Sequence, residues 1–290
     1  MLVGLAGAAV GLLPWLVHGA HLTLQNLWAT PTVDPADMPL VLLPFSQYQL
    51  DLVAGTIIVG SAVAGLAARV LARRGHPGAA LPIGAGLLAG QVAALAQTGT
   101  RVSAGLAHPG GVVRLIDDST AYLLIVVAWI LLSIAVGATV FLLLTRTSAS
   151  PVVLAIGIAA VVLGPWLRGF VAPITDVSPS PLGLLVAHWA PAVAVGAAVA
   201  SGGLRTVRRI IAASSALALL WVGTAALGGL AAAAGSRALL RLPDELAAAF
   251  ALVMTAELRG ASLLLVAAAA AVALAGVFGR WALVRPRLAG

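Results

Sequence analysis

Residues 119–145 read STAYLLIVVAWILLSIAVGATVFLLLT and contain no charged side chain. A helix rises about 1.5 Å per residue, so this stretch is long enough to cross the roughly 30 Å hydrocarbon layer of a membrane. Asp117 and Asp118 precede the stretch, and Arg146 follows it directly. This arrangement predicts a transmembrane helix with an acidic start and a basic end.

Similar apolar runs occupy most of the chain. Of its 290 residues, 61% are hydrophobic and 9% are charged, whereas an ordinary soluble domain carries about 25% charged residues. Eight runs have the length of a membrane span. They are residues 1–17, 49–72, 77–100, 119–145, 151–167, 183–204, 210–234 and 260–279. The sequence therefore predicts an all-α, polytopic integral membrane protein with eight transmembrane helices.

A further apolar run, residues 246–256, is too short to span a membrane. Pro243, Asp244 and Glu245 precede it, which is typical of a helix start. If this run continued into the last span as one helix, Glu257 and Arg259 would enter the hydrocarbon layer at a high cost. We therefore expect a separate short outer helix that lies at the membrane interface or dips into the membrane.

The charges predict the orientation of the helices. If the N-terminus is inside, the inner segments are residues 73–77, 146–150, 205–209 and the tail from Arg280, which hold most of the sixteen arginines and no acid. All nine acids then lie in the outer loops or at the helix starts beside them. Because arginine is enriched on the cytoplasmic side, we expect a multi-pass protein of the cell (plasma) membrane with both termini cytoplasmic.

The residue types that are missing exclude several kinds of chemistry. The chain has no Cys and no Lys, which removes disulfides, thiolate metal sites, cysteine or lysine nucleophiles and Schiff-base cofactors. The net charge of +7 comes from arginines at helix ends, where they favour anionic lipid headgroups. We therefore expect membrane lipids, not nucleic acid, as partners.

The word Pro-Trp-Leu occurs at residues 14–16 and again at 165–167. Both copies end an apolar run that is predicted to point outward, and the second and sixth spans both end in an arginine cluster. These features predict two tandem, parallel four-helix repeats, residues 1–146 and 147–290, a plan that some transporters use. The alternative is chance recurrence in a chain of low complexity.

No acidic or basic residue lies deep in a predicted span, which argues against a carboxylate proton relay. The candidate substrate-binding residues are Gln91, Trp15, Trp166 and His188. Gln91 is polar within the third span, the two tryptophans belong to the repeated word, and His188 lies near the outer end of the sixth span. The alternative for Gln91 is a hydrogen bond between helices.

The outer side holds the candidate metal ligands. His18 and His21 lie three residues apart after the first span, and Asp34 and Asp37 follow in the first outer loop. Imidazole and carboxylate groups bind divalent metals such as zinc. The sequence thus allows a divalent metal on the outer face. The alternative is that these histidines lie at the membrane interface, have separate roles and bind no metal together. No other cofactor is predicted.

Three functions fit these patterns. The first is a transporter-like or lipid-handling protein for an apolar or amphiphilic substrate, favoured by the uncharged interior, the repeat and the proline within the sixth span. The second is a non-catalytic subunit or assembly factor that works with other membrane subunits. The third is an outer-facing enzyme that acts on a lipid-linked substrate through acids of the outer loops. Taken together, the sequence patterns favour a protein that is not an enzyme.

Overall fold

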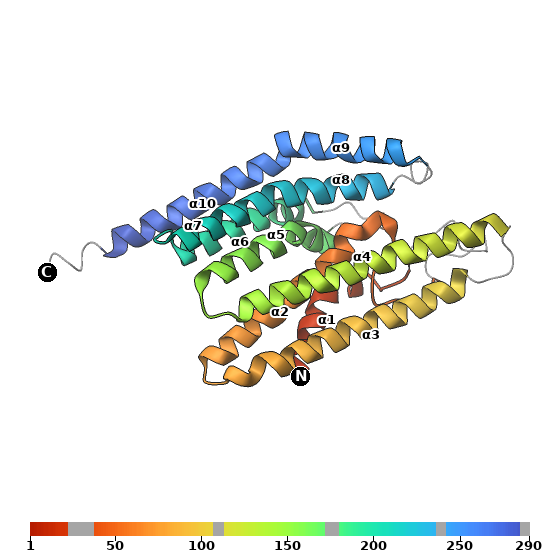
Figure 1. The fold of residues 1–290 in the computed structure, drawn as a ribbon, viewed down its shortest axis with the longest axis horizontal. Coiled ribbons are helices and arrows are strands. Elements are labelled where there is room, and N and C mark those ends of the chain that lie inside the picture. Colours follow the sequence, from red (N-terminus) through yellow and green to blue (C-terminus); the bar gives the residue numbers. More distant parts are fainter. Residues whose placement is uncertain (23–37, 107–112, 172–179, 236–241, 285–290) are drawn as a thin grey trace.

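The computed structural model describes residues 1–22, 38–106, 113–171, 180–235 and 242–284, and within these residues it contains ten α-helices and no strand (Figure 1). The helices are α1 (Leu2–Leu16), α2 (Leu50–Arg73), α3 (Ala80–Leu106), α4 (Val113–Thr145), α5 (Ala149–Val171), α6 (Pro181–Gly202), α7 (Val207–Ala218), α8 (Thr224–Gly235), α9 (Pro243–Arg259) and α10 (Ala261–Val284). Two short 3₁₀ segments, η2 (Gln47–Gln49) and η3 (Pro77–Ala79), precede α2 and α3. The predicted all-α class is confirmed.

Seven stretches of described helix are long and apolar enough to cross a membrane. One of them, Val207–Gly235, joins α7 and α8 through a π-helical turn, η4 (Leu219–Gly223). The eighth predicted span is α1, which has 15 residues and is therefore about 22 Å long, somewhat shorter than the hydrocarbon layer. The chain is thus a polytopic membrane protein, and its described residues include seven helices long enough to span a membrane and one short apolar helix.

The predicted short helix is α9; it begins at Pro243 as expected and continues three residues beyond the apolar run, to Arg259. It packs along α8 and ends at Arg259, where the chain bends at Gly260 (φ −114°, ψ −110°) before α10 begins. Figure 1 shows this bend between the two blue helices. The bend keeps α9 and α10 from forming one straight helix.

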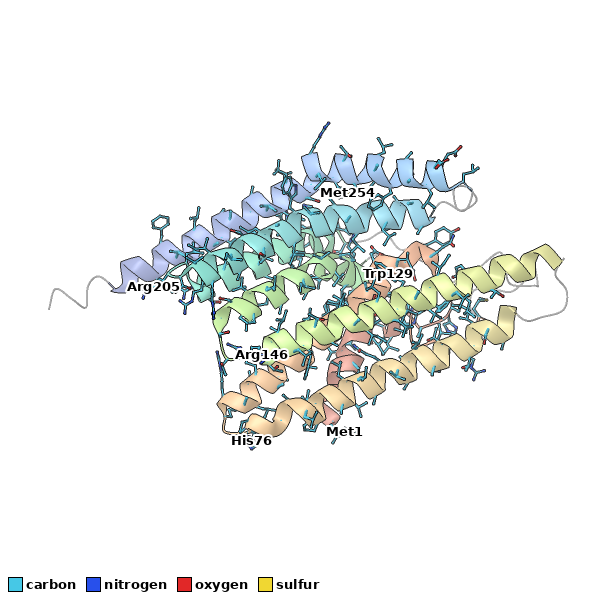
Figure 2. The ribbon with its side chains drawn as sticks, in the orientation of Figure 1. Met1, His76, Trp129, Arg146, Arg205 and Met254 are labelled. Atoms are coloured by element: carbon cyan, nitrogen blue, oxygen red, sulfur yellow. The ribbon has the colours of Figure 1, made fainter. Side chains whose placement is uncertain are left out.

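The long helices run side by side, and the arginine-bearing loops gather at one end of the bundle. Figure 2 shows His76, Arg146 and Arg205 at this end, which we call the arginine end. Arg69 strengthens it, because its guanidinium donates hydrogen bonds to the backbone carbonyls of Leu144, Arg146 and Thr147. Asp51, in the first turn of α2, marks the opposite end, which we call the acidic end.

Three helix contacts of the first half have counterparts in the second, whereas the packing of α9 on α8 has none. In the first half, α1 packs against α2 and α3, and α2 packs against α4. In the second half, α5 packs against α6 and α7, and α6 packs against α10. The halves meet where α5 contacts α2, α4 and α1.

Close contact between α1 and α2 depends on glycine. A Cβ atom on Gly11 would overlap the backbone carbonyl oxygen of Thr56, and one on Gly60 would lie 2.8 Å from the carbonyl oxygen of Gly7. Small residues let helix backbones approach in a membrane, where dispersion contacts hold helices together. These glycines therefore set how closely the first two helices pack.

Candidate functional site

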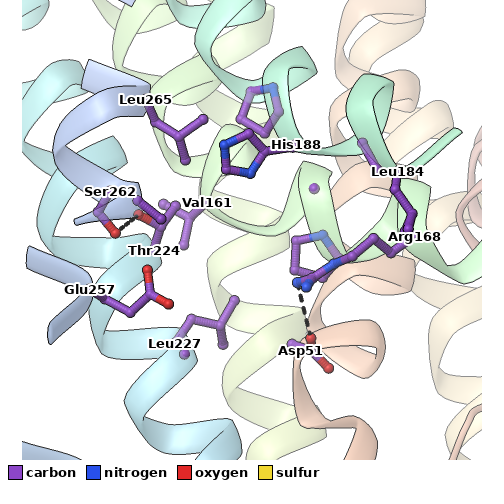
Figure 3. A pocket seen from close by; sticks show the side chains of 16 residues that line it. Asp51, Val161, Arg168, Leu184, His188, Thr224, Leu227, Glu257, Ser262 and Leu265 are labelled. Carbon is purple, nitrogen blue, oxygen red and sulfur yellow. Dashed lines mark hydrogen bonds and ion pairs between the residues drawn. The ribbon is translucent and has the colours of Figure 1, made fainter. Parts of the chain in front are cut away.

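A polar cavity of about 450 Å³ lies among helices of the second half, toward the acidic end (Figure 3). Of its described lining residues, Asp51 alone comes from the first half. Helices α2, α5, α6, α8, α9 and α10 all contribute to its walls. Most of the lining is apolar, but six side chains bring polar groups to it. They are Asp51, Arg168, His188, Thr224, Glu257 and Ser262.

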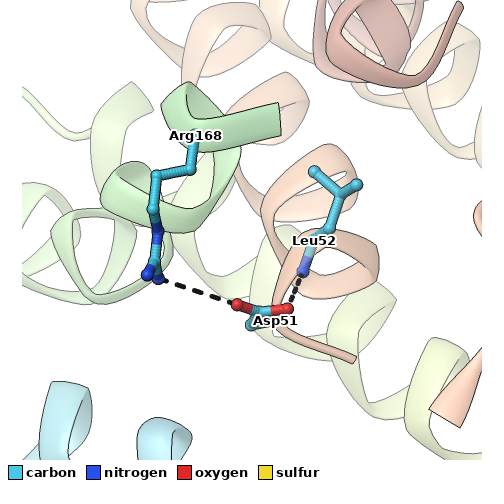
Figure 4. A network of polar contacts seen from close by, with 3 residues as sticks. All are labelled: Asp51, Leu52 and Arg168. Carbon is cyan, nitrogen blue, oxygen red and sulfur yellow. Dashed lines mark hydrogen bonds and ion pairs between the residues drawn. The ribbon is translucent and has the colours of Figure 1, made fainter. Parts of the chain in front are cut away.

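An acid and an arginine from different halves meet at one side of the cavity. Asp51 begins α2, and its Oδ1 accepts a hydrogen bond from the backbone N–H of Leu52 at 2.8 Å. Its Oδ2 lies 3.8 Å from Nη2 of Arg168, which is in the last turn of α5 (Figure 4). The Arg168 side chain is 55% exposed and that of Asp51 is 27% exposed. Because exposed ion pairs contribute about 0–1 kcal/mol, this pair is loose enough to exchange partners.

His188 lies on the wall that α6 forms, one turn before Pro191. Its ring meets the ring of Trp189 edge-on, with the centroids 4.7 Å apart. Figure 3 shows the imidazole directed into the cavity. Pro191 cannot donate a backbone hydrogen bond to Ala187, so the helix is weakened where it lines the cavity.

Glu257 lies on the opposite wall, near the end of α9, and its carboxylate points into the cavity in Figure 3. Within the described residues, this carboxylate has no hydrogen-bond or ion-pair partner. The neighbouring structure is firmly held, since Trp221 Nε1 donates to the Leu258 carbonyl at 2.9 Å. Thr224 Oγ1 donates to Ser262 Oγ at 3.1 Å and joins α8 to α10.

A second, apolar hollow of about 370 Å³ adjoins the polar cavity. We call it the apolar groove; helices α2, α4, α5, α8 and α9 and the η4 turn line it. Its two polar side chains, Trp129 and Ser133, are both hydrogen-bonded to backbone carbonyls. Val161 and Leu227 line both hollows, so the two spaces are adjacent.

The charges of the polar cavity do not cancel. Asp51 and Glu257 carry one negative charge each and Arg168 carries one positive charge, so with His188 neutral the lining has a net charge of −1. The cavity therefore favours a ligand group that is positive, or that carries both signs with a positive part near Glu257.

Of the four predicted substrate-binding residues, the structure places only His188 in the lining of this cavity. Gln91 is buried, and its Nε2 donates to the Ile57 carbonyl at 3.1 Å and to Ser61 Oγ at 3.0 Å. Trp15 donates its indole N–H to the Val41 carbonyl at 2.8 Å, and Trp166 donates to the Gly11 carbonyl at 2.8 Å. These three residues connect helices and loops.

The predicted metal ligands are described only in part. His21 Nδ1 donates to the Met38 carbonyl at 2.8 Å, and His18 is exposed just after α1. Asp34 and Asp37 lie outside the described residues. Within the described part of the chain, no three histidines or acids gather closely enough to hold a metal ion. A metal that uses Asp34 and Asp37 stays a prediction.

Sequence reasoning did not single out Arg168, Thr224 or Ser262, and it noted Asp51 and Glu257 only as outer acids. The alternating direction of the spans places all five near the same end of the bundle. The missing information was which helices are neighbours, because Asp51 and Arg168 are separated by most of the first half of the chain.

Comparisons of the chain with models of protein families, with curated proteins and with solved structures find no match. The functional interpretation therefore depends on the cavity, the groove and their residues.

Proposed function

We propose that this protein binds an amphiphilic molecule of the membrane, with the polar head in the cavity and the apolar tail in the groove. The observation that carries this proposal is the shared wall of Val161 and Leu227, which places a charged hollow directly beside an apolar one. Binding sites of drug-sized ligands combine apolar walls with a few polar groups, and each hollow has a volume in their usual range.

The depth of the two hollows supports an amphiphile. Helix α2 has 24 residues and is about 36 Å long, so Asp51 in its first turn lies at the level of the lipid headgroups. Ile58 lines the apolar groove and follows seven residues later, about 10 Å deeper. The polar cavity thus lies near the membrane surface and the groove lies within the hydrocarbon layer, as in a lipid molecule.

The groove is accessible from the bilayer. Leu132, one of its lining residues, is 54% exposed on the outside of the bundle. Because lipid tails cover this surface in a membrane, a ligand can enter from the side, tail first. With the arginine end cytoplasmic, both termini lie inside the cell, and the polar cavity faces the outer leaflet of the plasma membrane.

Irregular helices around the cavity favour a lipid-handling or transporter-like role. The surrounding helices include Pro165 within α5, Pro191 within α6, the π turn η4 and the bend at Gly260. Such interruptions weaken the backbone hydrogen bonds that keep a helix rigid. They let the walls move while the tightly packed α1–α2 pair stays fixed.

We further infer that residues 1–146 and 147–290 are two copies of one four-helix unit. The matching neighbours of α1 and α5 and of α2 and α6 support this inference, as do the two tryptophans of the repeated Pro-Trp-Leu. The apolar groove then lies where the copies meet, the position at which parallel-repeat transporters place their substrates. The polar cavity adjoins it within the second copy and reaches the first copy at Asp51.

The proposal is tested by filling the shared wall. Leu227→Trp adds bulk between the two hollows, whereas Leu264→Trp makes the same change at a position on α10 that is 59% exposed. We expect the original protein and L264W to retain a discrete lipid in native mass spectrometry after bulk lipid is stripped, and L227W to lose it. Melting in detergent verifies that both variants fold. Equal lipid retention by all three proteins would refute the proposed site, and a stoichiometric protein partner in place of the lipid would favour a subunit role.

A further inference from the structure

We propose that the head of the bound amphiphile is zwitterionic, with an ammonium group held by Glu257 and a phosphate held by Arg168. This inference rests on the proposed amphiphile site and names the chemical class of its ligand. The zwitterionic phospholipids that carry a primary amine have both groups.

The first observation behind this inference is the carboxylate of Glu257. It is partly buried, points into the cavity and lacks an ionic or hydrogen-bond partner within the described residues. At the level of the lipid headgroups, a partly buried carboxylate without a partner attracts a positively charged group. An ammonium group compensates this carboxylate by both charge and N–H donors.

The second observation is the net charge of the cavity lining. The lining has a net charge of −1 before a ligand binds, so a purely anionic head meets repulsion. A zwitterionic head adds no net charge, and its positive and negative groups can each pair with an opposite charge on one wall of the cavity.

The third observation is the position of Arg168. Its guanidinium lies on the α5 side of the cavity, across from Glu257 in Figure 3. The ion pair with Asp51, at 3.8 Å, is partly exposed and leaves other guanidinium N–H donors for a phosphate. Arginine suits phosphate oxygens because its planar fork donates two parallel hydrogen bonds. Opposite charges on opposite walls therefore match a head that carries both charges.

The test compares two synthetic phospholipids with identical acyl chains, phosphatidylethanolamine and phosphatidylglycerol. The full-length protein is incubated with an equimolar mixture, and the retained lipid is quantified by mass spectrometry after bulk lipid is removed. We expect the original protein to retain the amine lipid about tenfold over the glycerol lipid, which corresponds to about 1.4 kcal/mol.

The decisive variant is Glu257→Gln, and Glu245→Gln is its matched control. Glu245 lies in the first turn of the same helix, is exposed and is not part of the cavity lining. We expect E257Q to lose the tenfold preference while it retains the same total lipid, and E245Q to behave like the original protein. Arg168→Gln is expected to weaken the retention of both phospholipids, because both carry the phosphate.

Two results separate this inference from the proposed function. If the original protein retains a lipid with no preference for the amine, or if E257Q keeps the preference, the zwitterionic head is refuted and the amphiphile site stands. If no lipid is retained and L227W is indistinguishable from the original protein, the amphiphile site itself is refuted.

Discussion

Tryptophan side chains in this protein connect segments through their indole N–H groups. Trp15, Trp129, Trp166 and Trp221 each donate to a backbone carbonyl of another segment, namely those of Val41, Leu50, Gly11 and Leu258. A membrane offers no water to satisfy an N–H group at depth, so an internal acceptor is favoured. The two tryptophans of the repeated word thus have the same chemical role with different partners.

Gln91 has the same connecting role, and this leads to a prediction. Gln91→Leu removes both hydrogen bonds from α3 to α2, which we expect to lower the free energy of unfolding by about 1 kcal/mol, as for other hydrogen bonds between membrane helices. The measurement is the melting temperature in detergent. The control is Thr139→Val, because the Thr139 hydroxyl bonds to Ala135 of its own helix. Lipid retention should be unchanged in both variants, and a loss of it in Q91L would restore Gln91 as a substrate-binding residue.

At the scale of the element, glycine spacing controls helix packing. Gly11→Ala is predicted to push α1 away from α2, because the new Cβ meets the Thr56 carbonyl oxygen. Gly99→Ala is the matched control, since a Cβ on Gly99 of α3 meets no atom within 4 Å. Overpacking costs about 1–3 kcal/mol, whereas alanine in a free helix position is neutral or gains up to about 1 kcal/mol. Thermal melting should place G11A below the original protein and G99A at or above it; the reverse order would contradict the contact.

The elements themselves were largely predictable from the sequence. Uncharged runs between arginines and acids locate the spans because burying a charge in hydrocarbon is costly. The separate helix after Pro243 was predicted on the same ground, since Glu257 and Arg259 precede the last span. The bend angle at Gly260 and the packing of α9 on α8 were not predictable, because they depend on contacts with another helix. The π turn in the seventh span likewise has no clear signal in the residues around Trp221.

At the scale of the whole molecule, the candidate site was only partly predictable. The direction of each span places His188, Arg168, Asp51 and Glu257 near one end, so a polar site there follows from topology. Their convergence in one cavity depends on α9 lying beside α8 and on α5 lying between the halves. The mostly uniform apolar surface of each helix does not specify these neighbours, because every face is compatible with either lipid or protein.

The interface between the halves predicts that they stay together without a covalent link. A protease site inserted between Ser148 and Ala149, where the loop from α4 ends and α5 begins, divides the chain into residues 1–148 and 149–290. The contacts of α5 with α1, α2 and α4 remain, including the hydrogen bond from Trp166 of α5 to Gly11 of α1. After cleavage, we expect both fragments to elute as one complex in size-exclusion chromatography. Separate elution would show that the link itself holds the halves together.

The exposure of Leu132, which lines the apolar groove, has a consequence for how the proposed site would be occupied. A molecule that enters from the bilayer competes with every surrounding lipid, so occupancy follows its mole fraction in the leaflet rather than its concentration in water. A lipid present at one part in a hundred needs about 2.7 kcal/mol of preference over bulk lipid to fill half of the sites. The host membrane is then both the solvent and the supply of ligand, and a change in its composition alters occupancy without any change in the chain.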